Sequence, residues 1–157
     1  MSVVFYRIDD RLIHGQVMTG WSRKYSANRI IVIDDTTAAN SFLVQVMKMS
    51  VPKGMDVVVC AEKDGLETIK ADPEDKRTIV LTKTPETMLK LIEDGAPMKE
   101  LCLGGMGYVA GRKAILRNIQ VSPAELETLK AIAARGVEVF CQIVPDGKRI
   151  ELSQVKL

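Results

Sequence analysis

VVFYRIDDRLIHGQVMTGWSRKY, residues Val3 to Tyr25, passes from a short apolar run through a polar loop to a mixed segment. The run VVFYRI is typical of a buried strand, and GQVMTGWSRKY is consistent with a helix. IDDRLIH is then the connecting loop, and it places His14 at or just before the amino terminus of the helix. A strand that leads directly into a helix is the repeating unit of α/β folds.

The same alternation continues along the chain. Further runs are apolar on successive residues, as in parallel strands that are covered on both faces. They comprise Arg29 to Ile33, Asp56 to Cys60, Thr78 to Leu81, Glu100 to Leu103 and Val137 to Val144. We therefore predict a doubly wound, mostly parallel α/β sheet with right-handed crossovers and helices on both faces.

Three segments between the strands have helical spacing with start and stop signals. Residues 37–50 form the first, with Asp35, Thr36 or Thr37 as its cap. The second opens at Thr84-Pro85 and ends at Gly95, and the third opens at Ser122-Pro123 and ends at Gly136. Pro52-Lys53-Gly54, Asp72-Pro73-Glu74 and Pro145-Asp146-Gly147 are typical of turns, and no stretch is typical of an interdomain linker. We expect residues 1–157 to form a single domain.

Composition narrows the class of function. The chain of 157 residues is 46% hydrophobic, and folding at this size buries roughly 70% of the unfolded surface. With 22 basic and 20 acidic residues, the net charge of +2 gives no reason to expect a nucleic acid or an anionic membrane as partner. No run approaches the ~20 apolar residues of a membrane span, and MSVVFYRIDD is too short an apolar run for a signal peptide. We expect a soluble cytoplasmic protein.

The three cysteines are Cys60, Cys102 and Cys141, each within an apolar run. They form no C-x-x-C pair, and no histidine lies near them to complete a metal site. We interpret them as buried free thiols, which suits a reducing compartment, and we expect neither a metal nor a cofactor.

His14 is the only histidine. At a helix amino terminus it lies beside free backbone N–H groups and the positive end of the helix dipole, which favour an anion. A phosphoryl acceptor needs a free ring nitrogen and donors for the phosphoryl oxygens. Arg7 and Arg11 supply permanent cations, and Gly15 lets the backbone approach closely. Asp9 or Asp10 can hold an arginine or orient the imidazole ring.

Other functions remain open from the residues alone. A lone histidine is often a surface or capping residue. The paired Asp9 and Asp10, with Lys83 after a later strand, also imitate a signalling receiver module, but the third strand ends in Cys60-Ala61 and offers no aspartate to phosphorylate. A third alternative is a domain that binds a phosphorylated metabolite without bonding to its phosphate.

The motif R-I-D-D-R-L-I-H-G-Q-V, Arg7 to Val17, resembles the active-site signature of IIB subunits in the mannose/fructose/sorbose family of the bacterial phosphoenolpyruvate-dependent sugar phosphotransferase system. The resemblance covers nearly the whole chain and includes five weaker motifs. They are an aspartate after the second strand (Asp34 or Asp35), K-T-P (Lys83 to Pro85), L-G-G-M (Leu103 to Met106), and the pairs V-S (Val121, Ser122) and V-P (Val144, Pro145).

The resemblance implies that His14 accepts a phosphoryl group from a phosphohistidine of a IIA subunit and donates it to a sugar transported by the membrane subunits IIC and IID. It assigns Arg11 and Gly15 to the phosphate cradle, together with Arg7. Asp9, Gln16, Lys83 and Thr84 then support the site. The family also implies peripheral association with the transport subunits and suggests a homodimer.

Overall fold

The computed structural model describes residues 2–156, except for the side chain of Gln16. The strands are β1 (Val3–Ile8), β2 (Arg29–Ile33), β3 (Asp56–Cys60), β4 (Thr78–Thr82), β5 (Glu100–Leu103), β6 (Lys113–Leu116), β7 (Ile119–Val121), β8 (Glu138–Cys141) and β9 (Ile150–Glu151). The α-helices are α1 (Gly15–Tyr25), α2 (Asp35–Ala38), α3 (Ser41–Met49), α4 (Gly65–Lys70), α5 (Pro85–Glu93) and α6 (Pro123–Ala134). Within this described part, no helix is both long enough and apolar enough to cross a membrane.

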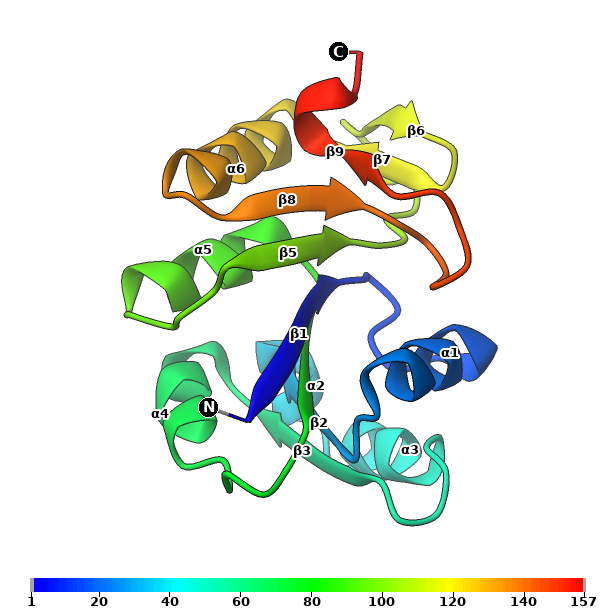
Figure 1. Cartoon of the computed structure of the whole chain (residues 1–157), viewed down its shortest axis with the longest axis vertical. Coiled ribbons are helices and arrows are strands. Elements are labelled where there is room, and N and C mark those ends of the chain that lie inside the picture. Colours follow the sequence, from blue (N-terminus) through cyan, green and yellow to red (C-terminus); the bar gives the residue numbers. More distant parts are fainter. Residues whose placement is uncertain (1, 157) are drawn as a thin grey trace.

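The main sheet has seven strands in the order β3-β2-β4-β1-β5-β8-β9 (Figure 1). Strands β1 to β5 and β8 pair in parallel, and β9 runs antiparallel to β8. This confirms the prediction of a mostly parallel α/β sheet. Strands β6 and β7 form a separate antiparallel hairpin, which the sequence did not predict.

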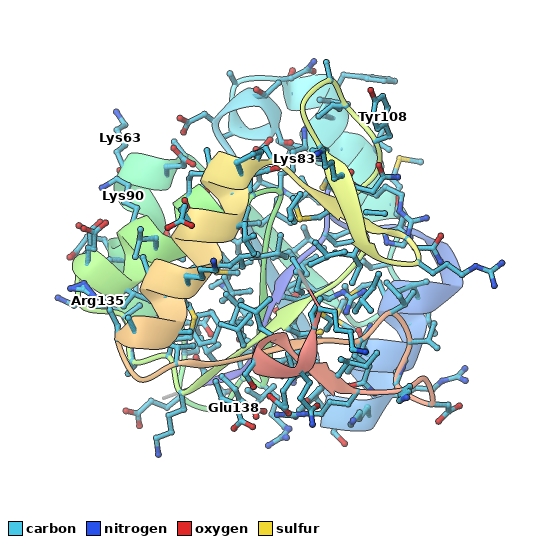
Figure 2. All side chains as sticks on the ribbon, turned by 90° about the horizontal axis from the view of Figure 1, so that it is seen from above. Lys63, Lys83, Lys90, Tyr108, Arg135 and Glu138 are labelled. Carbon is cyan, nitrogen blue, oxygen red and sulfur yellow. The ribbon has the colours of Figure 1, made fainter. Side chains whose placement is uncertain are left out.

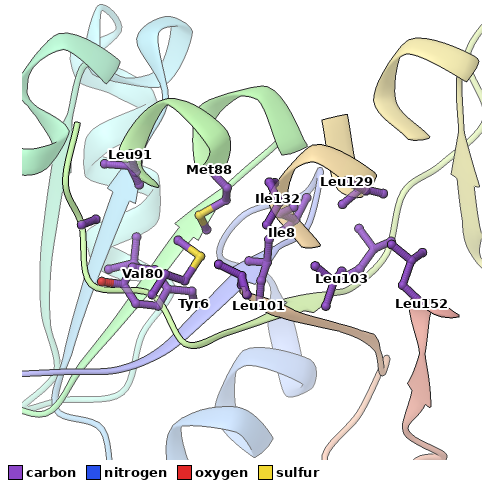
Figure 3. Close-up of a cluster of buried hydrophobic side chains, with 14 of the residues drawn as sticks. Tyr6, Ile8, Val80, Met88, Leu91, Leu101, Leu103, Leu129, Ile132 and Leu152 are labelled. Atoms are coloured by element: carbon purple, nitrogen blue, oxygen red, sulfur yellow. The ribbon is translucent and has the colours of Figure 1, made fainter. Parts of the chain in front are cut away.

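Helices cover both faces of the sheet, as Figure 1 shows with α4, α5 and α6 on one side and α1 and α3 on the other. On the α1 side, Phe5 stacks on the buried Trp21 at 4.7 Å. On the opposite side, Ile8 packs in a second cluster with Met88 of α5 and Leu129 of α6 (Figure 3). Burial on both faces explains why the strands are apolar on successive residues.

The neighbouring strands β1 and β5 have loops that lead to opposite faces of the sheet. The loop after β1 enters α1, and the loop after β5 leads through the β6–β7 hairpin to α6. Such a switch point opens a crevice at the carboxyl ends of the two strands, where doubly wound proteins bind their ligands. His14 lies in the first of these loops.

Two predicted elements differ from the structure. Residues 37–50 form not one helix but the end of α2 and all of α3, because the Asn40 side chain accepts hydrogen bonds from Phe42 N and Leu43 N and caps a new helix. The predicted strand from Val137 to Val144 is shortened to β8. Beyond it, the Gln142 amide donates to the carbonyls of Pro145 and Gly147, which bends the chain into a loop.

Candidate functional site

His14 is the N-cap residue of α1, as the sequence predicted, and its backbone is extended with φ −149°. The His14 side chain makes no capping hydrogen bond. It therefore does not use the free N–H groups in the first turn of the helix. Gly15 follows with φ +40°, a conformation that other residues rarely adopt, and a Cβ there would meet no atom within 4 Å. The imidazole is 19% exposed. The ring therefore lies at a shallow position beside an anion-attracting helix end.

The Asp9 carboxylate organises the site. Its side chain is only 1% exposed, and its Oδ2 lies 3.0 Å from His14 Nε2 and 3.3 Å from Arg7 Nη2. Its Oδ1 accepts a hydrogen bond from Arg11 N at 3.1 Å and lies 3.6 Å from Arg11 Nε. Asp9 thus performs both functions that the sequence allowed for an aspartate here: it holds arginines and orients the ring.

The contact between Asp9 and His14 fixes the form of the neutral imidazole. An ionised carboxylate only accepts hydrogen bonds, so Nε2 carries the proton that faces Asp9. In the neutral ring the other nitrogen, Nδ1, then holds a free electron pair. The nitrogen available to form a bond is therefore Nδ1.

The two arginines occupy different environments. The Arg11 side chain is 57% exposed and lies beside the same carboxylate that His14 contacts. Arg7 has no exposed surface: it donates to the carbonyls of Gln142 and Ile143 at 2.8 and 2.9 Å and to Asp9. In this arrangement Arg7 contacts Asp9 and two carbonyls and has no open side toward a phosphoryl group, so its predicted direct contact with that group stays a prediction. Arg7 donates a hydrogen bond to Asp9 from the protein interior.

The Gly104-Gly105 pair forms the floor beside these arginines. A Cβ on Gly104 would overlap with the Arg7 guanidinium and lie 2.8 Å from its Nε. A Cβ on Gly105 would lie 3.3 Å from Arg11 Nη2 and 3.7 Å from Asp9 Oδ1. Backbone hydrogen bonds join this pair to the end of β1 and the loop after it: Gly104 N donates to Ile8 O, and Asp10 N donates to Gly105 O. At Gly104 only glycine leaves room for the buried Arg7 guanidinium, whereas a Cβ at Gly105 would require only a small shift of the exposed Arg11 side chain.

Sequence reasoning missed a polar network that holds the loop after β5. Asp10, the sequence's alternative to Asp9, accepts a hydrogen bond from Gly107 N at 2.7 Å and lies 3.7 Å from Arg112 Nη1. Arg112 donates to Gly107 O at 2.8 Å and pairs with both carboxylate oxygens of Glu125 at 2.9 and 2.8 Å. Burial raises the pKa of Glu125, but hydrogen bonds from Arg112 and Ser122 and the Arg112 charge outweigh burial and lower the pKa overall. No motif in the sequence marked Arg112, whereas Glu125 stands at the S-x-x-E spacing of a capping box with Ser122, a signal that could have identified it.

Lys83 and Thr84 make other contacts in the structure. Lys83 and Thr84 follow β4 at the same edge of the sheet, but Lys83 Nζ lies 3.6 Å from Asp34 and Thr84 Oγ1 lies 3.4 Å from Thr87 Oγ1. Among the described side chains, neither forms a hydrogen bond or ion pair with His14. The side chain of Gln16 lies outside the described part of the structure.

The cysteines are free, and Cys102 and Cys141 are buried. Burial raises the pKa of Cys102 to about 11, although Arg7 opposes the shift, and burial raises that of Cys141 to about 12. Burial also raises the pKa of the half-buried Cys60. Neutral thiols are poor nucleophiles. His14 is therefore the better candidate for a group-transfer nucleophile.

Comparison with known proteins gives a consistent result. Residues 3–156 match the family described as PTS system sorbose subfamily IIB component. The chain is 31% identical to the N-acetylgalactosamine-specific phosphotransferase enzyme IIB component 1 of Escherichia coli (strain K12), over 96% of both chains.

Similarity extends to a solved structure and to a larger protein. The crystal structure of PTS system N-acetylgalactosamine-specific IIB component 1 from Escherichia coli superposes with a TM-score of 0.91 at 29% identity, and covers 96% of this chain and 99% of that one. The mannose-specific EIIAB component of Escherichia coli (strain K12) is 29% identical over 97% of this chain, which corresponds to 47% of that larger protein. The chain belongs to the sorbose subfamily of phosphotransferase system IIB components, which are sugar phosphotransferases.

Proposed function

We propose that His14 Nδ1 accepts a phosphoryl group from a phosphohistidine of a IIA subunit and donates it to a sugar held by the membrane subunits IIC and IID. The observation that carries this proposal is the 3.0 Å contact between Asp9 Oδ2 and His14 Nε2. It directs the free electron pair of the neutral ring to Nδ1, at a shallow site beside Arg11 and the amino terminus of α1.

Charge development in the first transfer fits the Asp9 contact. As Nδ1 bonds to phosphorus, the donor N–P bond breaks and its electron pair stays on the donor nitrogen. Because Nε2 keeps its proton, the His14 ring gains positive charge, which the nearly buried Asp9 carboxylate stabilises. The attacking nitrogen, the phosphorus and the departing nitrogen lie in line.

The phosphoryl oxygens of the intermediate need donors. Arg11 and the first N–H groups of α1 supply them in our proposal, with Gly15 giving open space next to the ring. In the second transfer a sugar hydroxyl oxygen bonds to phosphorus and the N–P electron pair returns to Nδ1. The hydroxyl proton leaves through a phosphoryl oxygen to solvent. Positioning and charge stabilisation supply the catalysis.

Both partners of this relay must meet the same edge of the sheet in turn. We propose a short-lived contact with IIA and a second contact with the IIC and IID subunits at the membrane surface, with residues 1–157 acting as one domain. The family resemblance also suggests a homodimer, and the molar mass from light scattering tests that suggestion.

The test of this function is phosphorylation from phosphoenolpyruvate through the general phosphotransferase proteins and a IIA subunit. We expect one phosphate per chain, lost in acid and retained in base, as for a phosphohistidine. The His14→Gln variant should carry no label while its circular dichroism spectrum stays unchanged. Labelling of the folded variant, or a phosphate that is labile in base, contradicts the assignment.

Nuclear magnetic resonance separates the two ring nitrogens. With ¹⁵N-labelled histidine, the phosphorylated protein should show the ¹⁵N–³¹P coupling at Nδ1. A coupling at Nε2 would mean that the Asp9 contact is broken on phosphorylation, against the proposal.

A further inference from the structure

A polar cavity of about 400 Å³ adjoins the phosphate cradle. It lies between the loops after β1, β5 and β8 and the β7 strand of the hairpin. Arg11 and Gly105 belong both to this cavity and to the surroundings of Asp9. The other lining residues are Asp10, Met106, Gly107, Asn118, Gln120 and Ile143. The cavity is therefore continuous with the place where the phosphoryl group is exchanged.

Two amide side chains in the cavity are available for a ligand. Among the side-chain hydrogen bonds of the described residues, none involves the amide of Asn118 or Gln120. Both residues do anchor their own backbone, since Met106 N donates to Asn118 O and Gln120 N donates to Met106 O. The hairpin thus holds two amides beside Arg11 without using them internally.

We propose that this cavity binds the hydroxyl groups of the acceptor sugar during the second transfer, an inference that rests on the proposed function. A primary amide offers two donors and a carbonyl acceptor, which matches the hydroxyl groups of a sugar. Asp10 adds an acceptor and Arg11 adds donors, so the two charges nearly cancel and favour a neutral polyhydroxyl ligand over a polyanion. Ile143 is partly exposed and supplies apolar surface for the C–H groups of a sugar ring, whereas Met106 has no exposed surface. No aromatic residue lines the cavity, which argues against a nucleobase.

The cavity is held in shape before any ligand arrives. Asp10 is fixed by Gly107 N, and Arg112 fixes Gly107 O from a side chain that is only 10% exposed. The pair of Arg112 with Glu125 joins this wall to the first turn of α6. A wall that needs no reorganisation lowers the entropy cost of binding a small ligand.

The experiment uses phosphorylated protein and membranes that contain IIC and IID. Transfer is measured to the most reactive of N-acetylgalactosamine, mannose, fructose and sorbose, and to each monodeoxy analogue of that sugar. Gln120→Met keeps the length of the side chain and removes the amide, and Asn118→Gly accommodates the left-handed backbone at φ +69°. Gln45→Met, at an exposed position on α3, is the matched control.

We expect Gln120→Met to slow transfer to the sugar about tenfold, as for the loss of a hydrogen bond to a substrate hydroxyl, and to leave the rate of phosphorylation by IIA within twofold. One monodeoxy analogue should react equally with the variant and the wild type, because the contact is already missing. Asn118→Gly should behave in the same way with that or another analogue.

Three outcomes overturn the proposal. The first is an unchanged rate of transfer from Gln120→Met to the parent sugar. The second is an equal loss of rate for the parent sugar and every analogue, which would indicate a role in docking to the membrane subunits. The third is a loss of rate in phosphorylation by IIA. Phosphate labelling of the folded His14→Gln variant would instead refute the proposed function itself. That label is measured in the IIA step without any sugar, so the two failures are distinguishable.

Discussion

The Asp9 carboxylate keeps a negative charge in a nearly closed environment and shares it among three groups. Arg7 approaches from the protein interior, Arg11 from the surface and His14 from the start of α1. Such a charge is tolerated only because its partners are held in place, and the removal of one partner leaves the others unpaired. The orientation and the tautomer of the His14 ring therefore depend on Asp9, which in our proposal does not bond to phosphorus.

Substitution Asp9→Asn tests this dependence. The amide cannot neutralise the buried Arg7, so we expect the free energy of unfolding in urea to fall by about 3 kcal/mol. Phosphorylation by IIA should slow at least tenfold, because the amide can also donate to Nε2 and reverse the tautomer. Asp146→Asn, at an exposed position in the loop after β8, is the control. An Asp9→Asn rate equal to that of the control would show that Asp9 does not orient the ring.

Gly104 gives a second test at the residue scale. Gly104→Ala would place a methyl group against the fully buried Arg7 guanidinium, which has no room to move away. We expect a loss of about 1–3 kcal/mol in the free energy of unfolding. In Gly20→Ala the new Cβ meets only Pro145 at 3.4 Å, and the helix propensity of alanine favours it. Equal stability of the two variants would contradict the close contact with Arg7.

The residues that could be predicted are those whose role is set by neighbours in the sequence. Asp9, His14 and Gly15 lie between the end of β1 and the first residue of α1, so their positions followed from the spacing of the strand and the helix. The role of Arg7 depends on the carbonyls of Gln142 and Ile143, more than one hundred residues away. No local pattern contains that contact, and this is why its burial was not foreseen.

At the scale of elements, the helices that open with proline and the strands with strong apolar runs were predicted with nearly correct bounds, apart from the run Val137 to Val144, of which only β8 is a strand. The hairpin was not, because β6 and β7 have only four and three residues and show no clear alternation. Its place is set instead by the bridge between Met106 and Ile119 and by the Arg112 network. The cavity proposed for the sugar consequently could not be predicted from the sequence.

The ion pair of Arg112 and Glu125 joins this hairpin region to α6, and it predicts a dependence of stability on pH. The pKa of Glu125 is lower in the folded protein than the 4.5 of an unperturbed glutamate. A lowered pKa means that the unfolded chain binds the proton first, so the pair stabilises the fold above about pH 4.5 and loses this effect as the pH falls through the folded pKa.

The measurement is the thermal midpoint of the wild type and of Glu125→Gln between pH 7 and pH 3.5. We expect the variant to be less stable at pH 7, with a difference that shrinks below pH 4.5. Glu127→Gln is the control, since Glu127 lies on the same helix with an exposed side chain. If the difference in thermal midpoint between the wild type and Glu125→Gln stayed constant from pH 7 to pH 3.5, the ionised pair would not be the cause of the stabilisation.

For the whole molecule, alternating strands and helices predicted the fold class, and the position of the site at the carboxyl edge followed from it. The order of the strands did not, because β1 pairs with β4 and β5, which are distant in sequence. That order places the loops after β1 and β5 together, and so joins the R-I-D-D-R-L-I-H-G-Q-V motif to the glycine pair. The resemblance in sequence named both motifs without showing why they belong together.

The edge of the sheet that holds His14 also presents apolar side chains to solvent. Tyr108 and Val109 in the loop after β5 are 70% and 52% exposed, and Val144 in the loop after β8 is 39% exposed. Figure 2 shows Tyr108 at the same end of the molecule as Lys83, opposite Glu138 at the start of β8. Gly107 directly precedes Tyr108, and Ile143 directly precedes Val144. Both Gly107 and Ile143 line the cavity beside Arg11. Exposed apolar groups around a shallow site suit a partner that docks briefly.

Tyr108 should therefore contribute to the encounter with IIA rather than to chemistry. For Tyr108→Ser we expect the KM for phosphorylated IIA to rise about tenfold with kcat nearly unchanged, because aromatic side chains at an interface commonly contribute 1 kcal/mol or more. Phe42→Ser is the matched control: Phe42 is 72% exposed as well, but it projects from α3 and not from the loops around the site. Initial rates of phosphoryl transfer at several IIA concentrations separate the two constants. A fall in kcat alone, or an equal rise in KM for Phe42→Ser, would show that docking does not depend on the Tyr108 loop.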